Sequence, residues 1–243
     1  MPNDLPRWAL AALLFGGALT WALAAVVFRR IDEPEAEPAA KDGQSLAEMW
    51  ALVTGDTDLQ RFLLVRSLML VTALSTPFIV VLAGDQGADL TGLGAFVIAS
   101  GGASLVGGRI SGLWSDRSSK RTMAGAAGIA STVIVALVLS ARAFGPGVNA
   151  WVMPLGFFLV NLAHTAVRVS RKTYLVDMAD GDKRTMITGA SNTVMGVVLL
   201  VVGAVSSAIA VLGPQAALIF LAIVGYAGVF GARNLKEVSA AAA

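Results

Sequence analysis

Cysteine is absent from the chain, and other residue types on which enzyme sites are built are scarce. Without a thiol there is no disulfide and no thiolate chemistry. Histidine occurs once, at His164, and no Ser/His/Asp set has a convergent placement. Hydrolase and metalloenzyme chemistry therefore lack residues to carry them, and we expect no enzyme activity, no metal and no cofactor.

Charged residues are few as well. They make up 14% of the 243 residues, whereas hydrophobic residues make up 56% and the mean hydropathy is +0.73. This composition exceeds the apolar content of ordinary soluble domains and favours a bilayer environment. A helix needs about 20 apolar residues to cross the hydrocarbon core. Stretches of that length predict seven spans, which run roughly over Trp8–Phe28, Phe62–Ala83, Thr91–Ile110, Met123–Ala141, Ala150–Val167, Met186–Val211 and Gln215–Ala232.

The positive charges indicate an orientation. Lys and Arg stay on the cytoplasmic side during insertion, and all but Arg7 and Arg142 of the 18 basic residues fall in alternate connections. The N-terminus is therefore predicted outside and the C-terminus in the cytoplasm, in a plasma membrane of the bacterial inner-membrane kind. The net charge of +2 is dispersed over short loops, so we expect no nucleic-acid partner.

The predicted spans divide the chain into three parts. Residues 1–30 form a single transmembrane helix, 31–60 a cytoplasmic linker, and 61–243 a compact block of six spans. The linker starts as IDEPEAEP, which has too little apolar surface to fold alone. It continues into SLAEMWALV, where Ser45 and Glu48 have capping-box spacing, which predicts a short amphipathic helix on the membrane surface.

The most informative motif is the charged segment GLWSDRSSKR, residues 112–121, between the third and fourth predicted spans. It resembles the signature loop of the major facilitator superfamily, Gly-x-Leu-x-Asp-Arg-x-Gly-basic-basic. Trp114 and Ser119 depart from that pattern. The matching residues are Gly112, Asp116, Arg117, Lys120 and Arg121.

The resemblance covers the whole chain and implies the C-terminal portion of such a transporter. The fold would be an all-α membrane protein with seven transmembrane helices: helix six of the family, followed by the six-helix C-terminal half. The function implied is secondary active transport of a small solute by alternating access. Asp116 and Arg117 would be conformational latch residues, although basic residues at span ends often serve only topology. Besides solute and lipid bilayer, the partner would be a missing N-terminal half or a second copy, because the chain resembles a truncated or partial transporter.

Polar residues inside the spans are candidates for the substrate cavity, because such groups are costly in a bilayer unless they face helices or water. Some of them precede Pro77, which frees a backbone carbonyl. Simple hydrogen bonds between helices are the alternative. The candidates are Thr72, Ser75, Thr76, Asn161, His164 and Asn192. No span contains Asp or Glu, so the usual carboxylate for proton coupling is missing.

A second charged segment, RVSRKTYLVDMADGDKR, follows the fifth predicted span and suits a cytoplasmic gate of salt bridges. Solvated helix caps are the alternative. The gate candidates are Arg168, Arg171, Lys172 and Asp177. Arg66, about one turn inside the second span, is expected to extend its side chain back to the headgroups.

Glycines recur every seven residues in two predicted spans and indicate close helix contacts, for which packing is the simpler explanation than a sliding surface. They are Gly94, Gly101, Gly108, Gly189, Gly196 and Gly203. Two other functions stay open: a seven-helix receptor and a noncatalytic membrane scaffold. The last span has no Lys, which argues against a retinal Schiff base.

Overall fold

The computed structural model describes residues 7–30, 46–88, 90–179 and 183–239, which belong to two units, Met1–Gly43 and Gln44–Ala243. In the first unit, α1 covers Arg7–Phe28, the segment predicted as the first span. Its described apolar stretch is Ala18–Val27. The first half of the linker, residues 31–45, which includes Ser45, lies outside the described residues.

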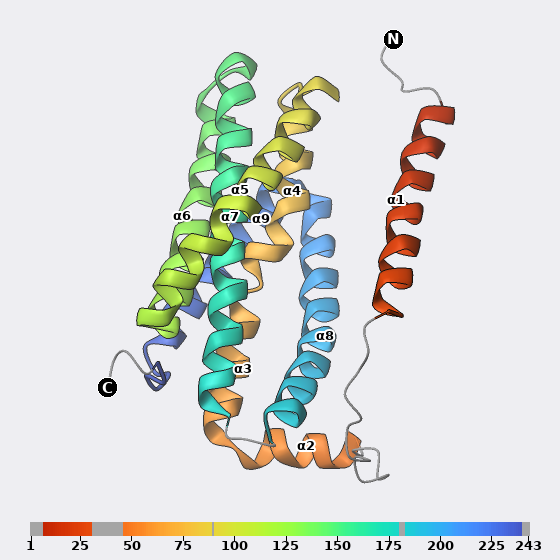
Figure 1. Cartoon of the computed structure of the whole chain (residues 1–243). Coiled ribbons are helices and arrows are strands. Elements are labelled where there is room, and N and C mark those ends of the chain that lie inside the picture. The colour runs from red at the N-terminus through yellow and green to blue at the C-terminus, as the bar shows by residue number, and fades with distance from the viewer. Residues whose placement is uncertain (1–6, 31–45, 89, 180–182, 240–243) are drawn as a thin grey trace. The chain divides into compact units, whose positions relative to one another are not determined.

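The second unit is helical throughout its described part (Figure 1). Six of its segments are long and apolar enough to cross a membrane. One of those segments is built from two helices, α3 and α4, and another ends in the short 3-10 helix η1. The elements are α2 (Leu46–Gly55), α3 (Thr57–Leu68), α4 (Val71–Asp85), α5 (Leu90–Arg117), α6 (Ser119–Ala143), α7 (Pro146–Met178), α8 (Lys183–Ile209), η1 (Ala210–Leu212) and α9 (Pro214–Ala232).

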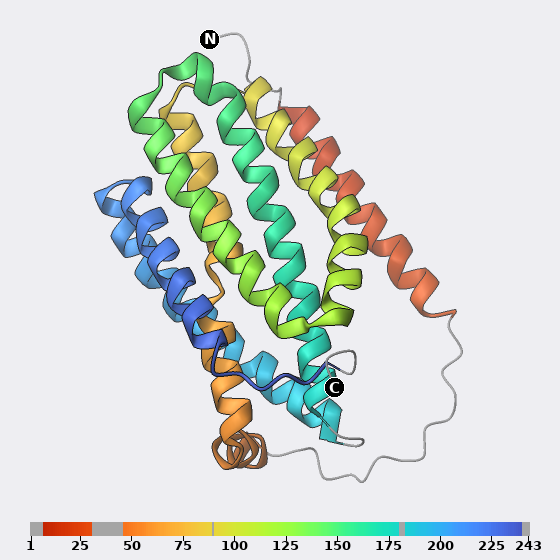
Figure 2. The ribbon, with the colours of Figure 1, turned by 90° about the vertical axis from the view of Figure 1, so that its left-hand side faces the viewer.

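The predicted surface segment does form a helix, α2. It begins one residue after Ser45 and packs against α3 and α8. Its axis crosses those of the spans, so that it is seen end-on beneath α3 in Figure 2. Val53 is buried, whereas Trp50 on the predicted apolar face is 65% exposed. The helix is confirmed, and its place on a membrane surface stays a prediction.

The spans run up and down, so their connections fall at two ends. We call the end with the α5–α6 and α7–α8 connections and the last turn of α9 the basic end, and the other the opposite end. Nearly all basic residues of the six spans lie toward the basic end, and Arg142 lies at the opposite end. This separation agrees with the charge pattern from which the orientation is predicted.

Two predicted spans are shorter than the helices that contain them. The third was expected to end at Ile110, but α5 continues to Arg117, and the fifth was expected to end at Val167, but α7 continues to Met178. The added turns contain polar and charged residues, among them Asp116 and Arg117 in α5 and Arg171 and Lys172 in α7, which a hydropathy criterion excludes from a span but which the helices nevertheless contain. The expectation that residues 112–121 form a connection between the third and fourth spans is therefore wrong: these residues are helical except for Ser118, which alone separates α5 from α6.

The second predicted span is interrupted where α3 ends and α4 begins, at Met69 and Leu70. Pro77, by contrast, lies inside continuous helix. Its missing amide would leave the carbonyl of Ala73 without a donor, and the Thr76 hydroxyl donates to that oxygen over 3.0 Å. The carbonyl freed by Pro77 is therefore taken by a hydroxyl of the same helix.

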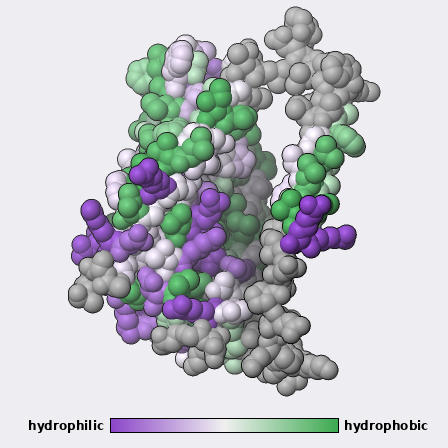
Figure 3. All heavy atoms as spheres, in the orientation of Figure 1, coloured by the Kyte–Doolittle hydropathy of each residue, from purple (hydrophilic) through white to green (hydrophobic). Residues whose placement is uncertain are grey.

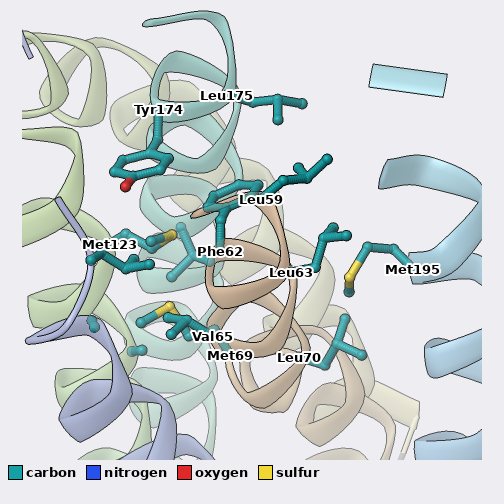
Figure 4. Packing of buried hydrophobic residues seen from close by; sticks show 14 of the residues in the cluster. Leu59, Phe62, Leu63, Val65, Met69, Leu70, Met123, Tyr174, Leu175 and Met195 are labelled. Atoms are coloured by element: carbon teal, nitrogen blue, oxygen red, sulfur yellow. The ribbon is translucent and has the colours of Figure 1, made fainter. Parts of the chain in front are cut away.

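One apolar cluster joins α3 to α6, α7 and α8 near the basic end (Figure 4). Phe62 stacks on Tyr174 with ring centroids 4.9 Å apart and planes 10° from parallel. From the other side Met195 of α8 approaches Leu63 and Leu70, as Figure 4 shows. This cluster fixes the part of α3 from which Arg66 also extends.

A second cluster fills the unit toward the opposite end, where α4, α6, α7 and α9 come closest. Close approach depends on glycine: a Cβ on Gly156 would lie 2.5 Å from the Leu137 side chain, and one on Gly225 would lie 2.7 Å from Val71. Neither glycine belongs to the two seven-residue series. The closest helix contacts inside the unit are therefore made at Gly156 and Gly225 and not at the glycines of the two series, for which the sequence predicted such contacts.

A buried amide organises the opposite end. Asn149 at the start of α7 is 1% exposed, donates to Gln86 over 2.9 Å and to the Phe144 carbonyl over 2.9 Å, and accepts from the Ser140 hydroxyl over 2.7 Å. These bonds join the ends of α4, α6 and α7. No simple sequence pattern marks Asn149, because its partners lie in three different segments.

Replacing Asn149 with Ala should destabilise the unit by about 1–3 kcal/mol, since it leaves buried polar groups without partners. Thermal unfolding of the purified protein in detergent measures the change. Asn234→Ala is the matched control, because Asn234 is exposed. Equal unfolding temperatures for the two variants would contradict the role given to Asn149.

Candidate functional site

Hydrophilic side chains gather on the lower part of the six-span unit, around the α5–α6 junction, in Figure 3. The segment after α9, residues 233–239, which we call the tail, lies against this basic end. Ser118 caps α6 by accepting from the Arg121 amide over 3.2 Å, and its hydroxyl donates to Glu237 over 2.8 Å. The Ser119 amide donates to Ser239 over 3.0 Å.

Two further helices hold the tail. The Tyr174 hydroxyl of α7 donates to the Lys236 carbonyl over 3.0 Å, and the Lys236 ammonium pairs with Asp58 of α3 over 2.6 Å. The tail thus connects α3, α6 and α7 at the basic end, three helices that belong to different parts of the chain. Sequence analysis did not single out the tail, because its hydrogen bonds use ordinary polar residues without a motif.

The motif residues have different surroundings. Lys120 donates to the carbonyls of Arg233 and Leu235, so it fastens the tail. Asp116 is exposed and makes no hydrogen bond or ion pair with the described residues. Arg117 and Arg121 line one end of a largely apolar groove of about 660 Å³ between α5, α6 and α7, together with Trp114. Of the five matching residues, Lys120 hydrogen-bonds to the tail, whereas Asp116 and Arg117 form no hydrogen bond with it.

Near the middle of the unit, Thr72 and His164 come together. The Thr72 hydroxyl lies 3.2 Å from Nδ1 of His164 and 3.3 Å from the Met69 carbonyl at the end of α3, which also accepts from the Thr72 amide over 3.5 Å. A helix break thus places a polar pair between α4 and α7. Asn161, expected to share this site, instead donates to the Phe157 carbonyl of its own helix over 2.9 Å.

Arg66 differs from its expected position. Its side chain is 8% exposed, and its Nη2 donates to the Asn192 amide oxygen of α8 over 3.2 Å. It is directed inward because Phe62, Leu63 and Val65 fix α3 in the apolar cluster. Arg171 of α7 is near enough to repel its charge. Nε of each arginine is buried and has no hydrogen-bond partner among the described residues.

The predicted salt-bridge gate is not formed among the described residues. Their two ion pairs both use Asp58, which binds Arg61 over 3.9 Å as well as Lys236. Arg168, Lys172 and Asp177 are exposed on the last turns of α7. Of the four gate candidates, only Arg171 turns into the unit.

The six cavity candidates therefore separate into groups. Thr72 contacts His164, and Asn192 contacts Arg66, whereas Thr76 and Asn161 bond to their own helices. Ser75 is buried with a hydroxyl that has no partner among the described residues. The described residues contain no group of His, Asp or Glu arranged to hold a metal ion.

Comparison of the chain with protein-family models, with curated proteins and with solved structures gives no match.

If Lys120 fastens the tail, Lys120→Ala should speed amide hydrogen exchange at residues 234 and 235, because the tail loses two bonds to α6. Exchange followed by mass spectrometry measures this. Lys172→Ala removes an exposed lysine at the same end and should leave exchange unchanged. Slow exchange in both variants would show that Lys120 is not needed to hold the tail.

Proposed function

We propose that the chain works as half of a secondary transporter of the major facilitator type, which moves a small solute by alternating access. In this mechanism two helical units rock against each other around a site near the middle of the membrane. The seventh span, α1, the plasma-membrane location, the cytoplasmic placement of the basic end and the latch role of Asp116 and Arg117 all belong to this proposal.

The observation that carries the proposal is the direction of the two glycine series. A Cβ added to Gly94, Gly101 or Gly108 of α5 would meet no atom within 4 Å, and the same holds for Gly189 and Gly196 of α8. Residues seven apart stay on one face of a helix, drifting by about 20° per step. The α5 series and the first two glycines of the α8 series therefore form smooth stripes directed away from the six-span unit, whereas a Cβ on Gly203 would lie 3.9 Å from Leu74.

These stripes suit a close-packed helical partner better than lipid. Small residues let helix backbones approach in a membrane, where no hydrophobic drive exists between helices. Lipid tails need no such smooth face. The helices that carry the stripes are also the least covered spans: 22% of the apolar stretch of α5 and 11% of that of α8 are buried, against 39% or 44% in the other four.

The polar groups in the unit support a solute site on the same side as α8. The interrupted span formed by α3 and α4 places Thr72 and His164 at a helix break, the kind of element around which transporters build binding sites. Asn192 extends from α8 to Arg66. A simple scaffold has no need of polar groups at these positions.

A screen of radiolabelled solutes in cells that express the chain tests transport, and the glycine stripes supply the decisive variant. Gly101→Leu should abolish solute flux while leaving the folded unit intact, because the new side chain projects into open space and blocks only the approach of a second unit. Flux and unfolding temperature are measured together.

Gly84→Leu is the matched control, since Gly84 is equally open but lies outside both series. Its flux should equal that of the unaltered chain. Flux that survives Gly101→Leu would contradict a moving interface at α5. A screen in which no solute moves under any membrane gradient would favour the scaffold.

A further inference from the structure

Arg66, which is buried, and Arg171, which is half-buried, lie close enough to repel each other and have no acidic partner among the described residues. This arrangement is costly, because a charge removed from water needs an opposite charge or several hydrogen bonds. Arg66 makes one hydrogen bond, to the neutral amide of Asn192, and Arg171 faces the charges of Arg66 and Arg168. Within the described residues no carboxylate pairs with any of these three arginines. The cluster therefore has excess positive charge.

The hydrogen-bond donors of the arginine cluster that have no acceptor indicate which kind of ligand would bind there. Nε of Arg66 and Nε of Arg171 are buried and have no acceptor among the described residues. Water cannot replace the missing acceptor of Arg66 easily, because this residue is more than nine-tenths buried. The hydroxyls of Ser170 and Ser191, which flank Arg171 and Asn192 in the chain, are also buried without a partner. Guanidinium groups bind carboxylate and phosphate oxygens in pairs.

We propose that Arg66 and Arg171, assisted by Asn192, form a binding site for an oxyanion, the phosphate or carboxylate group of a solute or of a lipid headgroup. An anion placed between the two guanidinium groups removes their repulsion and accepts from both open Nε atoms. The neutral Asn192 amide orients Arg66 without neutralising it, which leaves the charge available to the ligand.

The charged and titratable groups around the cluster fit the same ligand. His164 and Arg168 extend from α7, on the side of Arg171; Arg168 adds a further positive charge, and His164 lies within the electrostatic reach of both arginines. Asp58, the acidic residue nearest along α3, lies two turns from Arg66 and is already paired with Lys236 and Arg61. The cluster therefore attracts anions and repels cations, whatever the rest of the solute is.

Equilibrium binding to the purified full chain tests the site directly, with radiolabelled inorganic phosphate and radiolabelled succinate as probes at constant ionic strength. We expect saturable binding of at least one probe. Arg66→Gln or Arg171→Gln should weaken that binding on the order of 30-fold or more, since a desolvated charge pair is lost. Arg66→Lys keeps the charge but not the paired donors and should recover only part of the affinity.

Lys172→Gln is the control, because it removes an exposed positive charge beside Arg171 and should leave binding unchanged. If Arg66→Gln does not fold, Arg171→Gln and Arg66→Lys still decide the question. A second arm, in nanodiscs of phosphatidylglycerol or phosphatidylcholine, identifies a lipid source: phosphatidylglycerol would then stabilise the unaltered chain but not Arg171→Gln. Absence of effects in both arms, or equal effects in Lys172→Gln, overturns the proposal.

Binding is measured without transport, so the two proposals fail separately. Anion binding with no flux of any solute would leave the oxyanion site intact and count against the transporter. Flux of a neutral or cationic solute that is insensitive to Arg66→Gln and Arg171→Gln, together with no anion binding, would leave the transporter intact and remove the site.

Discussion

In the hydrocarbon interior of a membrane every polar group must find its partner within the protein, because water does not supply one. For spans as apolar as these, the constraint applies to the polar groups inside the unit. Asn149 hydrogen-bonds to the ends of α4 and α6, the Thr76 hydroxyl takes the carbonyl freed by Pro77, and the Thr72 hydroxyl donates to the Met69 carbonyl. Arg66 and Arg171 stand out against this background because their buried Nε atoms lack partners among the described residues.

The polar groups at the two ends of the unit also differ in charge and burial. Those that surround Asn149 at the opposite end are neutral side chains that hydrogen-bond to one another, and Arg142 is exposed beside them. At the basic end the tail holds α3, α6 and α7 together through Lys236 and Glu237, while Asp116 and Arg117 of the motif stay exposed. In the proposed latch, Asp116 and Arg117 would therefore be available to contact another helical unit, while the tail holds α3, α6 and α7 of this unit together.

Much of the fold follows from the sequence, because a span must be long and apolar whatever it packs against. The six described spans, of which Pro214–Ala232 is the last, lie where hydropathy predicts them. Helix ends beyond the membrane, as in α5 and α7, do not follow from hydropathy, since charged residues continue a helix in water. The site was less predictable: Thr72 and His164 were candidates, but the burial of Arg66 depends on how α3 packs against α7 and α8. No periodicity in α3 alone contains that information.

The proposed transporter requires that the glycine stripes of α5 and α8 face a second helical unit and not lipid. The chain has no cysteine, so a single cysteine introduced at Gly101 or Gly196 can carry a photoactivated crosslinker at one defined place. In native membranes both positions should give a crosslinked protein species, whereas Leu139, exposed on α6, should give lipid adducts alone. Lipid adducts alone at Gly101 and Gly196 would contradict the account.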